Sequence, residues 1–229
     1  MTTSTDTRDR GVRIPAGGVS LAGDLAVPDG ATGAVLFAHG SGSGRHSPRN
    51  RFVAGRLQSA GLATLLIDLL TEAEERADAR TGHLRFDIPF LADRLAGAVE
   101  WLAADPDTAG LRVGLFGAST GGGAALVAAA REPGKVGAVV SRGGRPDLAG
   151  DALPAARCPT LLVVGGNDGP VIGMNEDALA RLGAPVKELV IVPGAGHLFE
   201  EPGTLDEVAR LAAEWFSRHL GAGAGTYAG

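Results

Sequence analysis

Short apolar runs recur along this chain, and each of them ends in glycine or a polar residue. Such runs are typical of strands buried on both faces of a parallel sheet, where every side chain faces a packed layer. The runs are AVLFAHG from residue 34, ATLLIDLL from 63, LRVGLFG from 111, VGAVVSRG from 136, TLLVVGG from 160 and KELVIVPG from 187. Helical stretches separate most of them, so the pattern predicts an α/β fold with a mostly parallel sheet covered by helices on both faces.

The segments between and before these runs have their own periodicities. Residues 19–28, VSLAGDLAVP, carry apolar residues at alternate positions, which predicts an early antiparallel strand. The stretches 87–106 and 204–220 place apolar residues on one helical stripe. Ser47 followed by Pro48 has the residue types of an N-cap and a first helical position, which predicts a further helix start there.

We expect one domain over residues 11–220, because no linker, charge run or repeat divides the chain. Its 229 residues suffice for one large α/β domain with a sizeable core. The ends, residues 1–10 and 221–229, hold too few large apolar side chains to bury. They are therefore expected to be a disordered N-terminal tail and a flexible C-terminal tail.

Charge and composition exclude several classes of protein. A formal net charge of −5 argues against nucleic-acid binding, which requires a clustered basic surface. The N-terminus lacks the apolar stretch of a signal peptide, and no run approaches the roughly 20 apolar residues that span a bilayer. A single cysteine, Cys158, fits a reducing compartment, so we expect a cytoplasmic protein without membrane partners. No cysteine and histidine spacing suggests zinc, and we expect neither a metal nor a cofactor.

Three chemically active side chains each follow a different apolar run. Ser119, Asp168 and His197 come after the runs that begin at residues 111, 160 and 187, each among glycines. In open α/β sheets, ligands bind beyond the carboxyl ends of the strands, so these residues are expected at one edge.

The serine lies in a G-x-S-x-G pattern, Gly117 to Gly121. This pattern holds a serine on a sharp turn from strand to helix, where small neighbours are needed because the backbone is crowded. The helix start favours a developing negative charge, and the backbone N–H of Thr120 is expected to donate to it. The pattern therefore indicates a nucleophilic serine.

Four motifs together resemble the α/β-hydrolase superfamily. They are HGSGSG (39–44), GASTGG (117–122), GGNDGPV (165–171) and GAGHLFEEPG (194–203). Within the superfamily, the chain resembles the compact branch of dienelactone hydrolases and small bacterial serine esterases, over about residues 18 to 220. About 20 residues separate the runs that begin at residues 136 and 160, which leaves no room for a large cap domain.

The resemblance implies a catalytic role for each of these residues. Ser119 would attack an acyl carbon, His197 would take and return its proton, and Asp168 would hold the imidazole. The backbone N–H of Ser41, just past the His–Gly pair, would be the second oxyanion donor beside Thr120. The implied activity is hydrolysis of a small carboxylic ester, thioester or lactone.

Some residues have competing interpretations. Asp147 is a rival for the acid, because some relatives take it from an earlier strand end. His39 is expected to hydrogen-bond the loop that follows it, and Cys158 to be a small core residue. Dienelactone hydrolases usually carry cysteine where this chain has Ser119, so their particular lactone is not expected here.

The substrate is a small molecule in this interpretation, and three side chains are candidates to bind it. Arg142 and Arg145 follow a strand end and could pair with an anionic group, while Phe86 could supply apolar wall. Two alternatives stay open, namely a catalytically silent scaffold that binds a small molecule and an acyltransferase with the same triad. The oligomeric state stays open as well. A nucleotide-binding protein is disfavoured, because the glycine-rich turn lacks the G-x-x-x-x-G-K-[ST] lysine.

Overall fold

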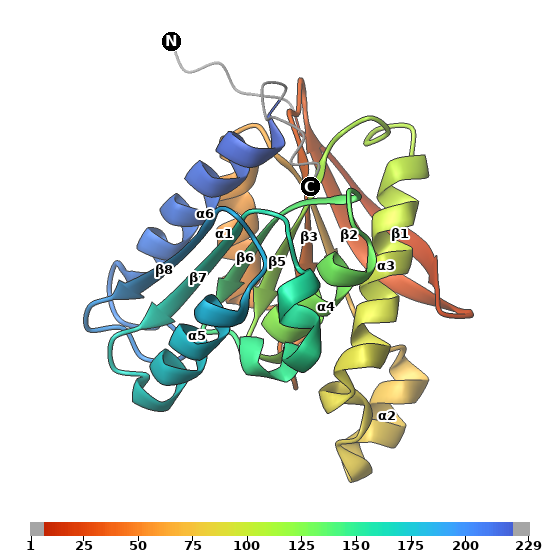
Figure 1. Ribbon diagram of the computed structural model, residues 1–229. Coiled ribbons are helices and arrows are strands. Elements are labelled where there is room, and N and C mark those ends of the chain that lie inside the picture. The colour runs from red at the N-terminus through yellow and green to blue at the C-terminus, as the bar shows by residue number, and fades with distance from the viewer. Residues whose placement is uncertain (1–6, 222–229) are drawn as a thin grey trace.

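The computed structural model describes residues 7–221, and its centre is one sheet of eight strands (Figure 1). The strands follow one another across the sheet in the order β1-β2-β4-β3-β5-β6-β7-β8. Their bounds are β1 Thr7–Ala16, β2 Val19–Pro28, β3 Ala34–Ala38, β4 Ala63–Ile67, β5 Val113–Ala118, β6 Val136–Arg142, β7 Thr160–Gly165 and β8 Lys187–Val192. The strands β3 to β8 pair in parallel, while β2 runs antiparallel to both β1 and β4. This confirms the predicted α/β fold with a mostly parallel sheet.

Helices cover both faces of the sheet, as Figure 1 shows. Their bounds are α1 Pro48–Ser59, α2 Glu72–Thr81, α3 Ile88–Ala104, α4 Thr120–Arg131, α5 Gly169–Arg181 and α6 Thr204–Leu220, with two 3-10 helices, η1 Leu84–Phe86 and η2 Pro146–Ala155. Helices α1 and α6 contact each other on one face, and α3 and α4 pack together on the other. Only η2 stands between β6 and β7, so no large cap domain covers the sheet there.

Side chains of the central strands divide between two apolar layers. Leu115 and Val139 join the layer under α3 and α4, whereas their neighbours Phe116 and Val140 join the layer under α1 and α6. Alternation is expected because successive side chains of a strand point to opposite faces. The central strands are therefore buried on both faces and their carboxyl ends lie at a common edge, where ligands bind in such sheets.

The start of the chain differs from the expectation. Residues 1–10 were expected to form a tail, which is wrong for Thr7–Arg10, because these residues belong to β1 and pair with Leu25–Pro28 of β2. Ion pairs with Asp105 and Asp107 hold them in place. The Arg8 Nη1 lies 2.6 Å from an Asp107 oxygen, and the Arg10 Nη2 lies 2.5 Å from Asp105 Oδ2. Backbone pairing and charge hold a segment that has few apolar side chains. The predicted tails over 1–6 and 222–229 lie outside the described residues.

The charged helix α2 has no counterpart in the sequence-based expectations. Its residues EAEERADART include no apolar stripe, but a capping box starts it, in which Thr71 accepts from the Glu74 N–H and Glu74 accepts from the Thr71 N–H. The T-x-x-E spacing was the available signal. Within residues 7–221, no helix has the length and apolar character needed to cross a membrane.

Arg94 of α3 links this helix to the end of β1 and to α2, so its replacement should destabilise the protein. Its Nη1 donates to the carbonyl of Ala16 at 2.6 Å, and its Nη2 lies 2.7 Å from Glu74 Oε1. Arg94→Leu should lower the free energy of unfolding by about 2 kcal/mol, because it leaves the buried Ala16 carbonyl without this donor and removes the charge partner of the half-buried Glu74 carboxylate. Denaturant unfolding measures this loss.

Arg131→Leu is the matched control for this experiment. It removes an exposed pair with Asp93, a type of pair that is worth about 1 kcal/mol or less. Equal losses in the two variants would contradict the role given to Arg94.

Candidate active site

Ser119 lies at a strained turn between β5 and α4. Its φ of 51° is in the left-handed region, which among the residues described here is shared by one other residue that is not glycine, Phe199. The flanking glycines explain how the turn closes. A Cβ on Gly117 would lie 2.5 Å from the Gly121 carbonyl oxygen, and one on Gly121 would lie 2.1 Å from the Ala38 oxygen. The turn therefore requires glycine at both positions and presents Ser119 at the surface of the sheet edge.

The loop after β3 packs against this turn. A Cβ on Gly40 would lie 3.0 Å from the Ser119 Cβ, so the backbone of the loop passes directly beside the serine. The Ser41 N–H donates to the Thr120 Oγ1 at 3.0 Å. The Thr120 N–H begins α4 and has no acceptor within the helix. Both amides predicted to bind an oxyanion thus lie next to Ser119. The Ser41 amide already donates its hydrogen bond to the Thr120 hydroxyl.

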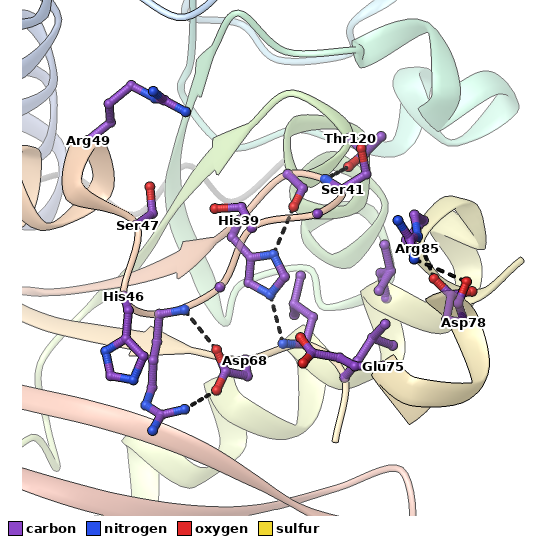
Figure 2. Close-up of a pocket in the computed structure, with 18 of the residues that line it drawn as sticks. His39, Ser41, His46, Ser47, Arg49, Asp68, Glu75, Asp78, Arg85 and Thr120 are labelled. Atoms are coloured by element: carbon purple, nitrogen blue, oxygen red, sulfur yellow. Dashed lines mark hydrogen bonds and ion pairs between the residues drawn. The ribbon is translucent and has the colours of Figure 1, made fainter. Parts of the chain in front are cut away.

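His39 connects the ends of β3 and β4, as Figure 2 shows. The Leu69 N–H donates to His39 Nε2 at 3.0 Å, so the ring proton belongs on Nδ1, which donates to the Gly40 oxygen at 2.9 Å. Burial lowers the pKa of His39 below its usual value. The ring is therefore neutral and shapes the loop, in agreement with the structural role expected for it.

A second anchor holds the far end of the same loop. The Arg45 N–H donates to Asp68 Oδ1 at 2.8 Å, and the Arg45 guanidinium pairs with the same carboxylate (Figure 2). Asp68 directly follows β4 in the chain. The loop is thus fastened to the end of β4 at both His39 and Arg45.

Asp168 and His197 come together across the ends of β7 and β8. Asp168 precedes α5, yet its side chain caps no helix N–H. Its Oδ2 lies 2.6 Å from His197 Nδ1. The Asp168 side chain is 12% exposed and that of His197 is 38% exposed. Because Nδ1 faces the carboxylate, Nε2 is the ring nitrogen that is left for another group.

The segments of Ser119 and His197 both lie against the end of β6. The Ser119 N–H donates to the Arg142 oxygen at 3.3 Å. A Cβ on the next residue, Gly143, would lie 3.0 Å from the His197 oxygen and 3.5 Å from its Nδ1. Among the described residues, Ser119 Oγ makes no hydrogen bond to His197.

The other sequence candidates have different surroundings. Arg145 binds both oxygens of Asp147, at 2.8 and 2.7 Å, so the rival acid pairs with an arginine and not with His197. Arg142 is buried, whereas Phe86 is 58% exposed on η1. Cys158 is partly buried before β7, and burial raises the pKa of its thiol to about 11, which disfavours the thiolate at neutral pH.

A pocket of about 860 Å³ lies on the α2 side of the loop after β3 (Figure 2). Its lining includes Ser41 and Thr120 together with residues of α2, but neither Ser119 nor His197. The pocket therefore reaches the candidate oxyanion amides from one side only. In the part of the chain that the structure describes, no group of three or more His, Cys, Asp or Glu residues is arranged to hold a metal ion.

Comparison with known proteins decides the family. The model of the dienelactone hydrolase family matches residues 21–220. The chain belongs to the dienelactone hydrolase family. A dienelactone hydrolase from Anabaena variabilis is 64% identical, with a TM-score of 0.91, over 93% of this chain and 99% of that one. An esterase from an Arctic intertidal metagenomic library, 17% identical with a TM-score of 0.74 over 96% and 98% of the two chains, has the same fold.

Curated relatives of this family member are longer proteins. Proteins of two Mycobacterium tuberculosis strains, each named as a putative phosphoribosyl transferase, are 59% identical over 214 residues. The match covers 93% of this chain and 47% of those proteins. The chain therefore spans about half the length of the curated relatives it matches.

Because His39 is neutral in the folded protein, the stability of the protein should depend on pH. The pKa of His39 is lowered in the folded state, so the unfolded chain binds a proton first as the pH falls below about 6.5. Stability should be fully present above that pH and fall below it, by at most about 1.4 kcal/mol per pH unit for this group. Unfolding between about pH 7.5 and about pH 5.5 should show a smaller decline in His39→Gln than in the original protein.

A histidine variant elsewhere is the control for this measurement. His83 lies in an exposed segment, and His83→Gln tests the loss of a histidine as such. The buried His219, whose pKa burial also lowers, contributes in the same direction to every protein compared. An equal decline in His39→Gln and the original protein would contradict the assignment.

Proposed function

We propose that this hydrolase family member is a serine esterase that cleaves small carboxylic esters through an acyl-enzyme on Ser119. The observation that carries the proposal is the contact of 2.6 Å between Asp168 Oδ2 and His197 Nδ1, at the same sheet edge as the strained Ser119. A nucleophile, a base and a group that orients the base are the parts that acyl transfer requires.

The first step forms the acyl-enzyme. Ser119 Oγ attacks the acyl carbon while its proton passes to His197 Nε2, and the leaving alcohol then departs with that proton. Asp168 holds the ring by Nδ1 and stabilises the imidazolium that forms. Water, activated by the same nitrogen, adds to the acyl carbon and releases the acid and the free serine.

Two amides are proposed to stabilise the oxyanion. The N–H groups of Thr120 and Ser41 lie beside Ser119, and the start of α4 adds a positive end of a helix dipole. The Thr120 hydroxyl must release or share the Ser41 amide when the oxyanion forms. The loop that carries Ser41 is already fixed by His39 and Arg45, so little reorganisation of backbone is needed.

Small substrates are favoured by the architecture around these residues. No large cap covers the sheet edge, and the nearby pocket of about 860 Å³ has a mixed lining of polar and apolar residues from α2 and the loop after β3. Esters are the principal proposal, and thioesters or lactones would use the same chemistry. An acyl acceptor other than water would make the protein an acyltransferase without any change of these residues.

The transferase name of the mycobacterial relatives supports no separate proposal. It refers to proteins about twice as long as the part that this chain matches. A silent binding scaffold is the remaining alternative, and the paired Asp168 and His197 beside a strained serine argue against it, because binding requires no such arrangement.

Removal of the nucleophile tests the proposal. Ser119→Ala should lower kcat for 4-nitrophenyl butyrate by about three orders of magnitude or more, because no other group takes the acyl intermediate. A fluorophosphonate probe should add one adduct to the original protein, measured by intact mass, and none to Ser119→Ala. Ser217→Ala, an exposed serine on α6, is the control and should label fully. Ester turnover retained by Ser119→Ala would overturn the proposal.

Paired variants of the two carboxylates test the choice of acid. Asp168→Asn should lower kcat by roughly 10³-fold or more, since the imidazole loses the partner that selects its tautomer. Asp147→Asn breaks only the pair with Arg145 and should have a much smaller effect. Steady-state kinetics on the same ester give both values. A larger loss for Asp147→Asn would assign the acid to the earlier strand end.

A further inference from the structure

The segment Arg142–Arg145, at and after the end of β6, holds the backbone of Ser119 from both sides. The Ser119 N–H donates to the Arg142 oxygen at 3.3 Å, and the Ser119 oxygen accepts the Arg145 N–H at 2.9 Å. The same oxygen accepts the Gly122 N–H of α4 at 3.0 Å. Because a strained conformation persists only where its surroundings fix it, these bonds help to hold the φ of 51° at Ser119.

Asn175, on α5, has a fully buried side chain that reaches this segment. Its Nδ2 donates to the Gly144 oxygen at 3.1 Å and to the Val171 oxygen, one turn earlier in α5, at 2.8 Å. Both partners are carbonyl oxygens, which accept only, so they determine which end of the amide is the nitrogen. Asn175 therefore ties Gly144 to α5, the helix that begins directly after Asp168.

The Gly144 oxygen and the Arg145 N–H belong to one peptide unit. Because that unit is planar, it cannot turn without moving both groups. The oxygen accepts the Asn175 amide, and the N–H donates to the Ser119 oxygen. A continuous chain of hydrogen bonds thus runs from a side chain of α5, through one peptide, to the backbone of the candidate nucleophile. Bonds linked in this way strengthen one another.

The buried amide contributes more to orientation than to stability. The Oδ1 of Asn175 is buried and has no hydrogen-bond partner among the described residues. An unpaired buried acceptor costs free energy and offsets much of what the two N–H bonds contribute. On its other side, Gly144 has no room to move, since a Cβ there would overlap the Ser141 Oγ. The peptide that follows Gly144 is therefore held between β6 and Asn175.

We propose that Asn175 is a positioning residue, which holds the Gly144–Arg145 peptide and through it the backbone of Ser119. It touches no reacting atom. Gly143, in the same segment, lies against His197, so the segment also borders the proposed base. The proposal rests on the esterase activity and adds to it a buried side chain, outside the candidate triad, that helps to set the rate of acyl transfer.

Kinetics of Asn175 variants test this role. Asn175→Leu keeps a similar shape and removes both N–H donors. It should lower kcat for 4-nitrophenyl butyrate by about 10- to 100-fold, because a displacement of about 1 Å in a reacting group can cost that much. KM should change by less than about 3-fold, since no group that binds the ester is altered. Asn175→Gln, which keeps the amide donors, should retain more of kcat than Asn175→Leu.

Thr108→Val is the matched control for the loss of a buried hydrogen bond. The Thr108 Oγ1 is buried and donates to the Leu102 oxygen at 2.6 Å. Thr108 precedes β5, whereas Ser119 follows it, so the control lies at the opposite end of the strand. Both variants remove a side-chain bond to a buried carbonyl and should lower the Tm. Only Asn175→Leu should lower kcat when each protein is assayed well below its Tm.

Backbone amide exchange, followed by NMR, tests the same link without turnover. The Arg145 amide should exchange at least about 10-fold faster in Asn175→Leu than in the original protein, because the peptide that carries it is no longer held. The Gly143 amide, which donates to the Val163 oxygen of β7 at 2.7 Å, should keep its rate. This pair of amides separates a local release of the peptide from a general loosening of the fold.

Two results would overturn this role of Asn175. One is a kcat in Asn175→Leu that equals that of Thr108→Val, which would mean that Asn175 only stabilises α5. The other is an unchanged exchange rate of the Arg145 amide. Absence of ester turnover and of probe labelling in the original protein would instead overturn the esterase. The exchange of Arg145 would then still decide whether Asn175 holds the turn of Ser119.

Discussion

The close approach of the β5–α4 turn to the loop after β3 is the constraint on which the candidate site depends. The Ala38 oxygen would lie 2.1 Å from a Cβ on Gly121, so the loop and the turn meet only because that atom is missing. This contact sets Gly40 beside Ser119 and brings the Ser41 amide to the first residue of α4. The sheet supplies the rest of the geometry, because both segments lie against the end of β6. The Arg142 carbonyl accepts the Ser119 N–H, and the next residue, Gly143, lies against His197.

Much of this arrangement could be predicted from the sequence, because buried parallel strands leave a strong apolar signal. The six runs and the alternating strand were found, as were Ser119, Asp168 and His197 at their ends. The N-terminal strand was missed because Arg8 and Arg10 hold it by charge and backbone pairing. Helix α2 was missed because it has no apolar stripe and is held by its caps and by Arg94.

Membership of the dienelactone hydrolase family agrees with the mostly parallel sheet and with the absence of a large cap domain between β6 and β7. The family model matches residues 21–220, which leaves β1 outside it, and a relative from Anabaena variabilis shares the structure closely. Asp168 contacts His197, while Asp147 pairs with Arg145, so the two candidate acids have different partners.

The Ser41 amide donates to the Thr120 hydroxyl, so a substrate oxygen would have to compete with this hydroxyl for the amide. A ground-state carbonyl oxygen is neutral and competes on nearly equal terms with a hydroxyl for the amide. The tetrahedral intermediate carries a full negative charge and forms a stronger, charge-assisted bond. In the proposed reaction, the amide would therefore bind the ligand mainly when charge develops, so the resting contact would weaken substrate binding more than it weakens binding of the transition state.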